Sequence, residues 1–227
     1  MDNATRLQYL DAMGIDVWMP RGEVSSEHAT LPIEEVASMQ SSDNMGWIAL
    51  QKQVEECKQC ILSNTRVQTV FGEGDINADW MLVGEAPSQN EGIEGKPFLG
   101  QAGFLLTEML RAVGLKRSSV YITNVVKCSP PDNKDPKVAE LMSCNGYLLR
   151  QITLLKPKII VAVGRVAAHT LLGTKQPLSE LRGVVHRVND IPVVVVYHPA
   201  YLLRSLLEKR KAWQDLQLAL KIYQEEK

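Results

Sequence analysis

The stretch Lys158-Ile-Ile-Val-Ala-Val-Gly164 is a short, unbroken apolar run that ends at a glycine. Such a run predicts a strand that is buried on both faces. The apolar run Trp80–Val83 and the mostly apolar segment Val120–Val126 precede it and are also expected to be strands. Helical patterns lie between the runs, over Ala102–Val113 and Val138–Leu155. Strands that alternate with helices predict an α/β fold, a three-layer α/β/α domain with a mainly parallel central sheet.

The remaining segments extend this pattern. An extended segment is expected over Val67–Phe71, and a short helix over Val166–Leu172. Val184–Val188 and Pro192–Tyr197 are expected to form a hairpin across an Asn-Asp turn. One long amphipathic helix is expected from Pro199 to Tyr223.

The composition is that of an ordinary globular protein. Of 227 residues, 45% are hydrophobic and 22% charged, which excludes collagen-like, disordered and disulfide-scaffold proteins. No apolar run approaches the roughly 20 residues of a membrane helix, and Met1–Trp18 carries acidic residues where a signal peptide is basic and then apolar. We expect a cytoplasmic protein without a membrane partner.

The charge is divided unevenly along the chain. Residues 1–56 hold three basic and ten acidic residues, whereas residues 57–227 hold 22 basic and 16 acidic. Residues 21–44 are rich in Ser, Glu, Thr and Pro and predict a flexible linker. We therefore expect a short docking peptide over 1–20, a linker over 21–44 and a mildly basic domain over 45–227, suited to a polyanionic partner.

Polar residues follow the predicted strands directly. They lie in the loop Gly84–Glu91, at Asn124 and Cys128, and in the segment Tyr197–Tyr201. Ligands of parallel α/β sheets bind beyond the carboxyl ends of the strands. The sequence therefore predicts one functional site at this rim.

The four cysteines form a C-x2-C pair and a C-x15-C pair, at Cys57, Cys60, Cys128 and Cys144. Four thiolates can close a tetrahedral zinc site or hold an iron-sulfur cluster. The wide second spacing favours iron-sulfur, because zinc ribbons usually carry two close pairs. Zinc, and four unrelated buried thiols, remain as alternatives.

Four motifs in order, together with these cysteines, resemble the type-4 uracil-DNA glycosylases. The motifs are Gly84-Glu-Ala-Pro87 with Glu91, Gly95–Gly103, Thr123–Cys128 and His198–Arg204. The resemblance spans about Trp47 to Tyr223. It implies a uracil-DNA glycosylase-like domain that excises uracil from DNA and binds a [4Fe-4S] cluster.

The residue chemistry agrees with that activity, which requires a flipped base to be stacked, read at its edge and released as an anion. Phe98 offers a flat face for stacking, and Asn124 can pair with the N3-H and O4 edge of uracil. His198 can donate to O2 as charge develops there. Glu85 can orient or deprotonate the attacking water, or stabilise an oxocarbenium-like sugar.

The chain departs from related patterns in the first motif. Better-known families of uracil-DNA glycosylases have a catalytic Asp at the position of Ala86. The type-4 family, like this chain, has no Asp there. Ser88 replaces the usual Gly, and Gly92 replaces an acidic residue. Ala86 and Glu91 are expected in the uracil pocket, with Glu91 as the residue that rejects the thymine methyl group.

The segment after His198 is expected to contact DNA. Leu202 and Leu203 can supply an apolar wedge that fills the gap left by a flipped base. Arg204 is then placed to bind a phosphate.

The N-terminal segment Leu7–Arg21 is similar to the peptide by which the psi subunit of the bacterial clamp loader docks onto the chi subunit. Met13, Ile15 and Trp18 would supply the apolar anchors. Two functions therefore compete. One is a uracil-DNA glycosylase that this peptide tethers to the replication machinery, and the other is a non-catalytic psi-like subunit that binds chi and keeps the fold and cluster.

Overall fold

The computed structural model describes residues 45–226. The docking peptide predicted over 1–20, with its anchors Met13, Ile15 and Trp18, lies outside the described residues, as does the linker predicted over 21–44. Within the described part, no helix combines the length and apolarity needed to cross a membrane.

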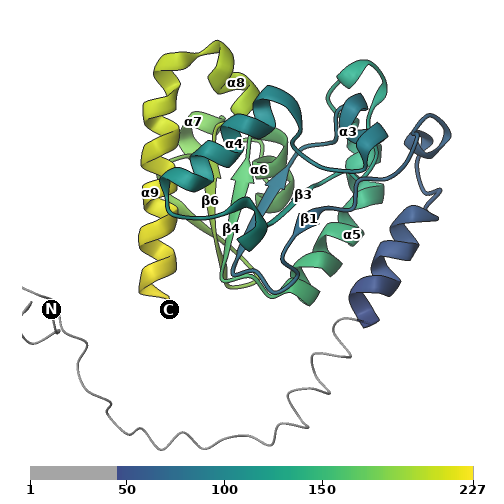
Figure 1. Cartoon of the computed structure of the whole chain (residues 1–227), viewed down its shortest axis with the longest axis horizontal. Helices are drawn as coiled ribbons and strands as arrows, with labels where there is room; N and C mark the ends of the chain where they lie inside the picture. The colour runs from purple at the N-terminus through teal and green to yellow at the C-terminus, as the bar shows by residue number, and fades with distance from the viewer. Residues whose placement is uncertain (1–44, 227) are drawn as a thin grey trace, which may run out of the picture. The chain divides into compact units, whose positions relative to one another are not determined.

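Four parallel strands form the centre of a six-stranded sheet with the order β1-β3-β2-β4-β6-β5 (Figure 1). They are β2 (Trp80–Gly84), β3 (Tyr121–Asn124), β4 (Ile159–Val163) and β6 (Ile191–Val196). Every residue of β2, β3 and β4 is buried, as expected for strands covered on both faces. The predicted mainly parallel sheet is confirmed.

Both edge strands are antiparallel. β5 (Val185–Val188) pairs with β6 through a turn in which Asn189 and Asp190 have positive φ angles of 49° and 65°, as the predicted hairpin requires. At the other edge, β1 (Glu73–Gly74) pairs with β3. The segment expected to be extended over Val67–Phe71 precedes β1 and forms no strand, since strand pairing begins at Glu73.

Helices cover both faces, as Figure 1 shows. Alternate side chains of β2 point to opposite faces: Met81 and Val83 pack in one core cluster, Trp80 and Leu82 in the other. The first cluster includes residues from a helix over 45–55, α5 (Val138–Leu155), α6 (Arg165–Leu172) and α7 (Leu178–Leu181). The second includes residues from α4 (Gly100–Ala112) and α9 (Lys209–Glu225). The three-layer architecture is confirmed.

The single helix expected from Pro199 to Tyr223 is wrong. The chain forms α8 (Pro199–Arg204), a 3-10 turn η4 (Leu206–Glu208) and then α9. Ser205 breaks the helix, with φ −125° and ψ 74°. Further short elements are α3 (Gln89–Glu94), η1 (Ile61–Asn64), η2 (Arg117–Ser119) and η3 (Pro131–Asn133).

Candidate functional site

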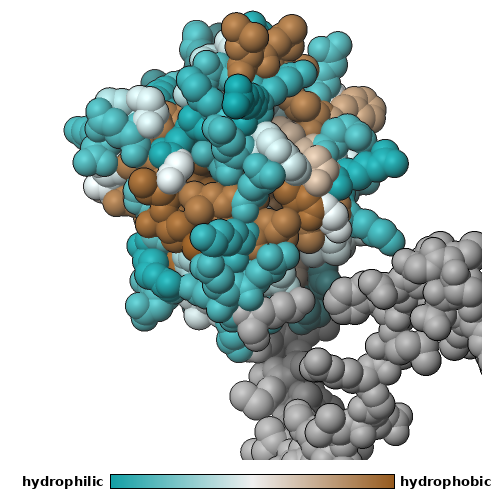
Figure 2. All heavy atoms as spheres, turned by 90° about the vertical axis from the view of Figure 1, so that its left-hand side faces the viewer, coloured by the Kyte–Doolittle hydropathy of each residue, from teal (hydrophilic) through white to brown (hydrophobic). Residues whose placement is uncertain are grey.

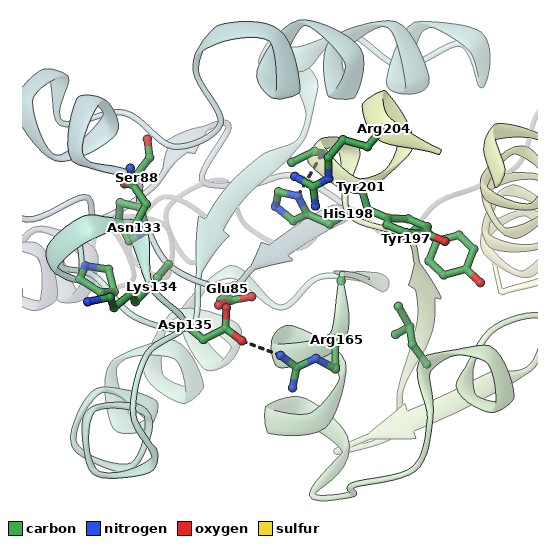
Figure 3. Close-up of a pocket in the computed structure, with 16 residues that line it drawn as sticks. Glu85, Ser88, Asn133, Lys134, Asp135, Arg165, Tyr197, His198, Tyr201 and Arg204 are labelled. Atoms are coloured by element: carbon green, nitrogen blue, oxygen red, sulfur yellow. Dashed lines mark hydrogen bonds and ion pairs between the residues drawn. The ribbon is translucent and has the colours of Figure 1, made fainter. Parts of the chain in front are cut away.

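A cavity of about 590 Å³ lies at the carboxyl ends of β2, β4 and β6. Its walls come from four separate segments, over residues 85–88, 130–135, 164–165 and 197–204, with Leu178 (Figure 3). The cavity lies at the rim where the sequence predicts the functional site. Of the predicted site residues, the cavity itself is lined by Glu85, Ala86, His198 and Arg204.

His198 is the N-cap of α8, and its ring is fixed by that role. Its Nδ1 accepts a hydrogen bond from the backbone N-H of Ala200 at 3.2 Å, which assigns the proton of the neutral ring to Nε2. Burial, and then the charge of Arg204, lower the pKa of His198 to about 4. At neutral pH the residue is therefore an uncharged imidazole whose Nε2-H can donate a hydrogen bond.

Phe98 packs directly against this imidazole. The two rings are stacked, with centroids 5.5 Å apart and an interplanar angle of 26°. Phe98 has a positive φ of 52°, which is unusual for a residue with a bulky side chain. Gly103 permits this loop conformation, since a Cβ there would overlap the carbonyl oxygen of Phe98.

Asn124 lies at the end of β3 and is 2% exposed. Its Nδ2 is buried and has no hydrogen-bond partner among the described residues. A Cβ on Gly84 would overlap Asn124 Oδ1 and would lie 2.6 Å from the Phe98 ring. The amide and both rings predicted to hold the base are therefore neighbours, brought together from three segments.

Glu85 follows β2 and faces the cavity. Its pKa is raised to about 7, first by burial and then by the negative charge of Asp135, while Arg165 acts in the opposite direction. A carboxyl group with a pKa near neutrality is suited to exchange protons during a reaction. Sequence reasoning missed Asp135, because no periodic pattern marks the loop that carries it.

Glu91 does not line the cavity. Its carboxylate accepts hydrogen bonds from the backbone N-H groups of Ser88 at 3.1 Å and Leu99 at 3.0 Å, the first within a capping box that begins α3. Glu91 therefore links α3 to the loop that carries Phe98, and its role in rejecting a thymine methyl group stays a prediction. Gly92 is explained by its contact with Ser129, whose Oγ would lie 2.5 Å from an added Cβ.

The residues predicted to contact DNA fall into two groups. Leu202 is 1% exposed and belongs to the core, so the wedge predicted at this position is wrong, whereas Leu203 is 37% exposed. The sequence reasoning also missed Leu206 and Leu207, which are 64% and 92% exposed in η4 because the predicted long helix is broken. Figure 2 shows apolar side chains at the top of the molecule, where α8 and α9 join.

A second, smaller cavity is lined by all four cysteines. Each has a free thiol, Cys57 and Cys60 half-buried and Cys128 and Cys144 buried. Arg66 donates from Nη1 to Cys128 Sγ at 3.1 Å, and the backbone N-H of Lys127 donates to Cys144 Sγ at 3.3 Å. In the part of the chain that the structure describes, no three Cys, His, Asp or Glu side chains form a ready metal site.

Lys127 lines the cysteine cavity and is also a residue that sequence reasoning missed. It is 1% exposed, and its Nζ donates to Thr123 Oγ1, Asn124 O and Gln151 Oε1, each at 2.6 Å. These bonds anchor the end of β3, at which Asn124 stands. A lysine next to the apolar run Val125-Val126 was the available signal, since a buried lysine needs several acceptors.

Comparison with known proteins agrees with this geometry. Residues 71–217 match the model of the uracil DNA glycosylase superfamily. The type-4 uracil-DNA glycosylase of Archaeoglobus fulgidus is 41% identical over 160 residues, covering 67% of this chain and 80% of that protein. That of Saccharolobus solfataricus is 42% identical over 181 residues, covering 74% and 83%. The chain therefore belongs to the uracil-DNA glycosylase superfamily and, within it, to the type-4 uracil-DNA glycosylases.

Proposed function

We propose that the protein is a uracil-DNA glycosylase, a hydrolase of base excision repair that cleaves the N-glycosidic bond of deoxyuridine in DNA. The observation that carries this proposal is the buried, unpartnered Nδ2 of Asn124 next to Phe98. A buried amide donor without a partner is costly, and a ligand that supplies an acceptor removes that cost. The O4 of a flipped uracil is such an acceptor.

Base recognition divides among three side chains. Phe98 supplies the apolar ring for stacking, and Asn124 accepts from N3-H while donating to O4. Cytosine presents an acceptor at N3 and a donor at N4, so the same amide orientation leaves both groups mismatched. Rejection of an analogue that mismatches buried polar groups is strong, which favours uracil over cytosine.

His198 acts on the leaving group. As the bond between C1′ and N1 lengthens, negative charge collects on uracil, including O2. The Nε2-H of a neutral His198 is a donor that stabilises this charge without first losing a proton to water. Glu85 lines the cavity, and its proposed role is to orient the attacking water or to stabilise the positive charge on the sugar. Ala86, which stands beside it, supplies no second carboxylate.

DNA contact is assigned to the α8 end of the cavity. Arg204 lines the cavity and carries the charge expected of a phosphate ligand. Leu203 is the exposed member of the predicted leucine pair and is proposed to face DNA, whereas Leu202 supports α8 from the core.

The four cysteines are proposed to hold a [4Fe-4S] cluster, with zinc as the alternative. The donor set fits, because four free thiols from two distant parts of the chain line one small cavity and accept hydrogen bonds from Arg66 and from the backbone of Lys127. When bound, the cluster supplies metal-thiolate bonds that join residues 57–60 to Cys128 and Cys144.

The residues before the domain are proposed to bind a partner protein and to take no part in catalysis. Division of the chain into a docking peptide over 1–20, a linker over 21–44 and a catalytic domain over 45–227 rests on composition and charge. The proposed partner of Met13, Ile15 and Trp18 is the chi subunit of the clamp loader. A pull-down of full-length protein with chi tests this, since Trp18→Ala should abolish the binding and unchanged binding would exclude the proposal.

Release of uracil from a uracil-containing oligonucleotide tests the main proposal. Asn124→Ala and His198→Ala should each reduce release by at least about 100-fold, the usual loss when a transition-state donor is removed. Asn189→Gly is the matched control, because Asn189 lies in the β5-β6 turn with a positive φ that glycine adopts freely. A protein with a full complement of metal that releases no uracil would favour the non-catalytic psi-like subunit instead.

A further inference from the structure

Glu85 shares the cavity with a second carboxyl group, that of Asp135. The two side chains come from different parts of the fold, Glu85 from the end of β2 and Asp135 from the segment between η3 and α5. Both side chains line the same wall of this cavity, so their carboxyl groups act on each other electrostatically. Figure 3 shows them side by side, pointing into the same space.

Arg165 forms an ion pair with Asp135 at the mouth of the cavity, where both side chains are exposed. It stands at the start of α6, and its Nη2 lies 2.6 Å from Asp135 Oδ2. The segment that carries Asp135 is itself fixed, because Asn133 Oδ1 accepts a hydrogen bond from the backbone N-H of Gln89 at 2.8 Å. Asp135 is thus oriented from one side by α6, while its segment is tied to α3 on the other.

We propose that Asp135 is the positioning residue of Glu85. It shares a proton with Glu85 and so makes Glu85 the base that takes a proton from the attacking water. Arg165 is the counter-ion that limits the effect of the Asp135 charge on Glu85. This inference rests on the proposed glycosylase function. It adds two residues outside the four motifs, Asp135 and Arg165. In this proposal Asp135 acts through Glu85 and does not itself contact the substrate.

The electrostatics of the cavity support this arrangement. Besides Asp135 and Arg165, the titratable or charged side chains that line the cavity are Lys134, Tyr197, His198, Tyr201 and Arg204. His198 has a pKa lowered to about 4 and does not change charge near neutrality. The pKa of Glu85, raised to about 7, is pushed up by burial and by Asp135 and pushed down by Arg165. Among the residues that line the cavity, Glu85 is therefore the group to which we assign the acid limb of activity near neutral pH.

The step balances without a further reactant. The bond between C1′ and N1 breaks, and its electron pair leaves with uracil. The oxygen of water bonds to C1′, and the proton that this water loses passes to the ionised Glu85 carboxylate. A carboxylate whose pKa lies near the working pH is a better proton acceptor than an ordinary one. The proton then leaves to solvent, or to the uracil anion, and Glu85 is restored.

The test is the pH dependence of single-turnover uracil release in the full-length, metal-loaded protein. Asp135→Asn removes the negative charge beside Glu85, so the acid limb should move about one unit to lower pH, whereas Arg165→Gln should move it to higher pH. Asp135→Glu should keep the limb near its original place. A merely structural role predicts lower rates without opposite displacements.

A second measurement does not depend on catalysis. The carboxyl group of Glu85 can be titrated by NMR with 13C-labelled glutamate, its signal assigned by its loss in Glu85→Gln. The midpoint should fall in Asp135→Asn and rise in Arg165→Gln. Equal midpoints in the three proteins would overturn the proposal even if the protein released no uracil. Absence of uracil release together with the expected displacements would instead overturn the proposed function alone.

Discussion

The ring of Phe98 lies stacked on the imidazole of His198, with 5.5 Å between the ring centroids. Two residues that are 100 positions apart in the sequence thus form one packed unit before any base is bound. The positive φ of Phe98 and the capping role of His198 restrict both rings, which reduces the ordering that uracil binding must impose. The site is therefore largely formed in advance.

Gly84 leaves the space in which Asn124 and Phe98 pack closely, and Gly84→Ala should disrupt this packing. The new Cβ would overlap Asn124 Oδ1 and crowd the Phe98 ring at 2.6 Å. We expect uracil release to fall by about 100-fold, because a displacement of about 1 Å at a site can have that effect. Gly146→Ala is the control, since a Cβ there meets no atom within 4 Å. Equal uracil release by the two variants would contradict the described packing.

Leu202 and Leu203 provide a matched pair that separates stability from DNA binding. Leu202 is buried, so Leu202→Ala should lower the free energy of unfolding by about 2 to 5 kcal/mol through the cavity it leaves. Leu203→Ala should change stability by less than about 1 kcal/mol and should weaken binding to uracil-containing DNA. Urea unfolding and fluorescence anisotropy measure the two effects. Weaker DNA binding in a fully folded Leu202→Ala protein, with none in Leu203→Ala, would reverse the assignment.

Much of the fold was predictable because its strands are continuous apolar runs. β2 and β4 can be read from Trp80–Val83 and Ile159–Val163, and the parallel sheet follows from the helices between them. The break at Ser205 was not predictable, because the leucines before and after it continue an amphipathic pattern. Helical periodicity alone does not reveal where tertiary packing ends a helix.

Some residues of the candidate site could likewise be predicted from the sequence, and others could not. Asn124 is the last residue of β3 and His198 comes shortly after β6, so the rule for parallel sheets located both. The capping role of Glu91 was not predicted, because a motif records which residue is present, and not whether its carboxylate is used in a helix cap. Asp135 and Lys127 were missed because their partners Arg165 and Gln151 are far away in the sequence.

The cysteine cavity makes a prediction about metal content. Cys144→Ser should lower iron bound per chain by more than about tenfold and remove the broad visible absorbance, since loss even of an outer partner of a metal site has effects of this size. Ser143→Ala is the control, because Ser143 lines the same cavity without offering a thiol. Metal analysis and absorbance spectra measure both variants. A colourless wild-type protein that contains zinc would replace iron by zinc in the proposal.

Glu85 and His198 should give stability opposite dependences on pH. The folded-state pKa of His198, about 4, lies below its ordinary value of 6.5, so this residue's contribution is lost as the pH falls from about 6.5 to 4. The folded-state pKa of Glu85, about 7, lies above its ordinary value of 4.5, so the folded state retains a proton that the unfolded chain releases, and stability falls as the pH rises through this window. In the wild-type protein the two contributions partly cancel.

Glu85→Gln removes one of these contributions and exposes the other. Relative to wild type, the variant should therefore gain stability as the pH is raised from about 4.5 to 7, and the difference should level off above that range. His198→Asn should behave in the opposite sense, with its disadvantage relative to wild type shrinking as the pH falls. Urea unfolding across this range measures both differences, in which contributions from groups common to all the proteins, such as Asp215, cancel. A pH-independent difference for Glu85→Gln would mean that Glu85 titrates alike in the folded and unfolded states, and the proton proposed for the Glu85 and Asp135 pair would be absent.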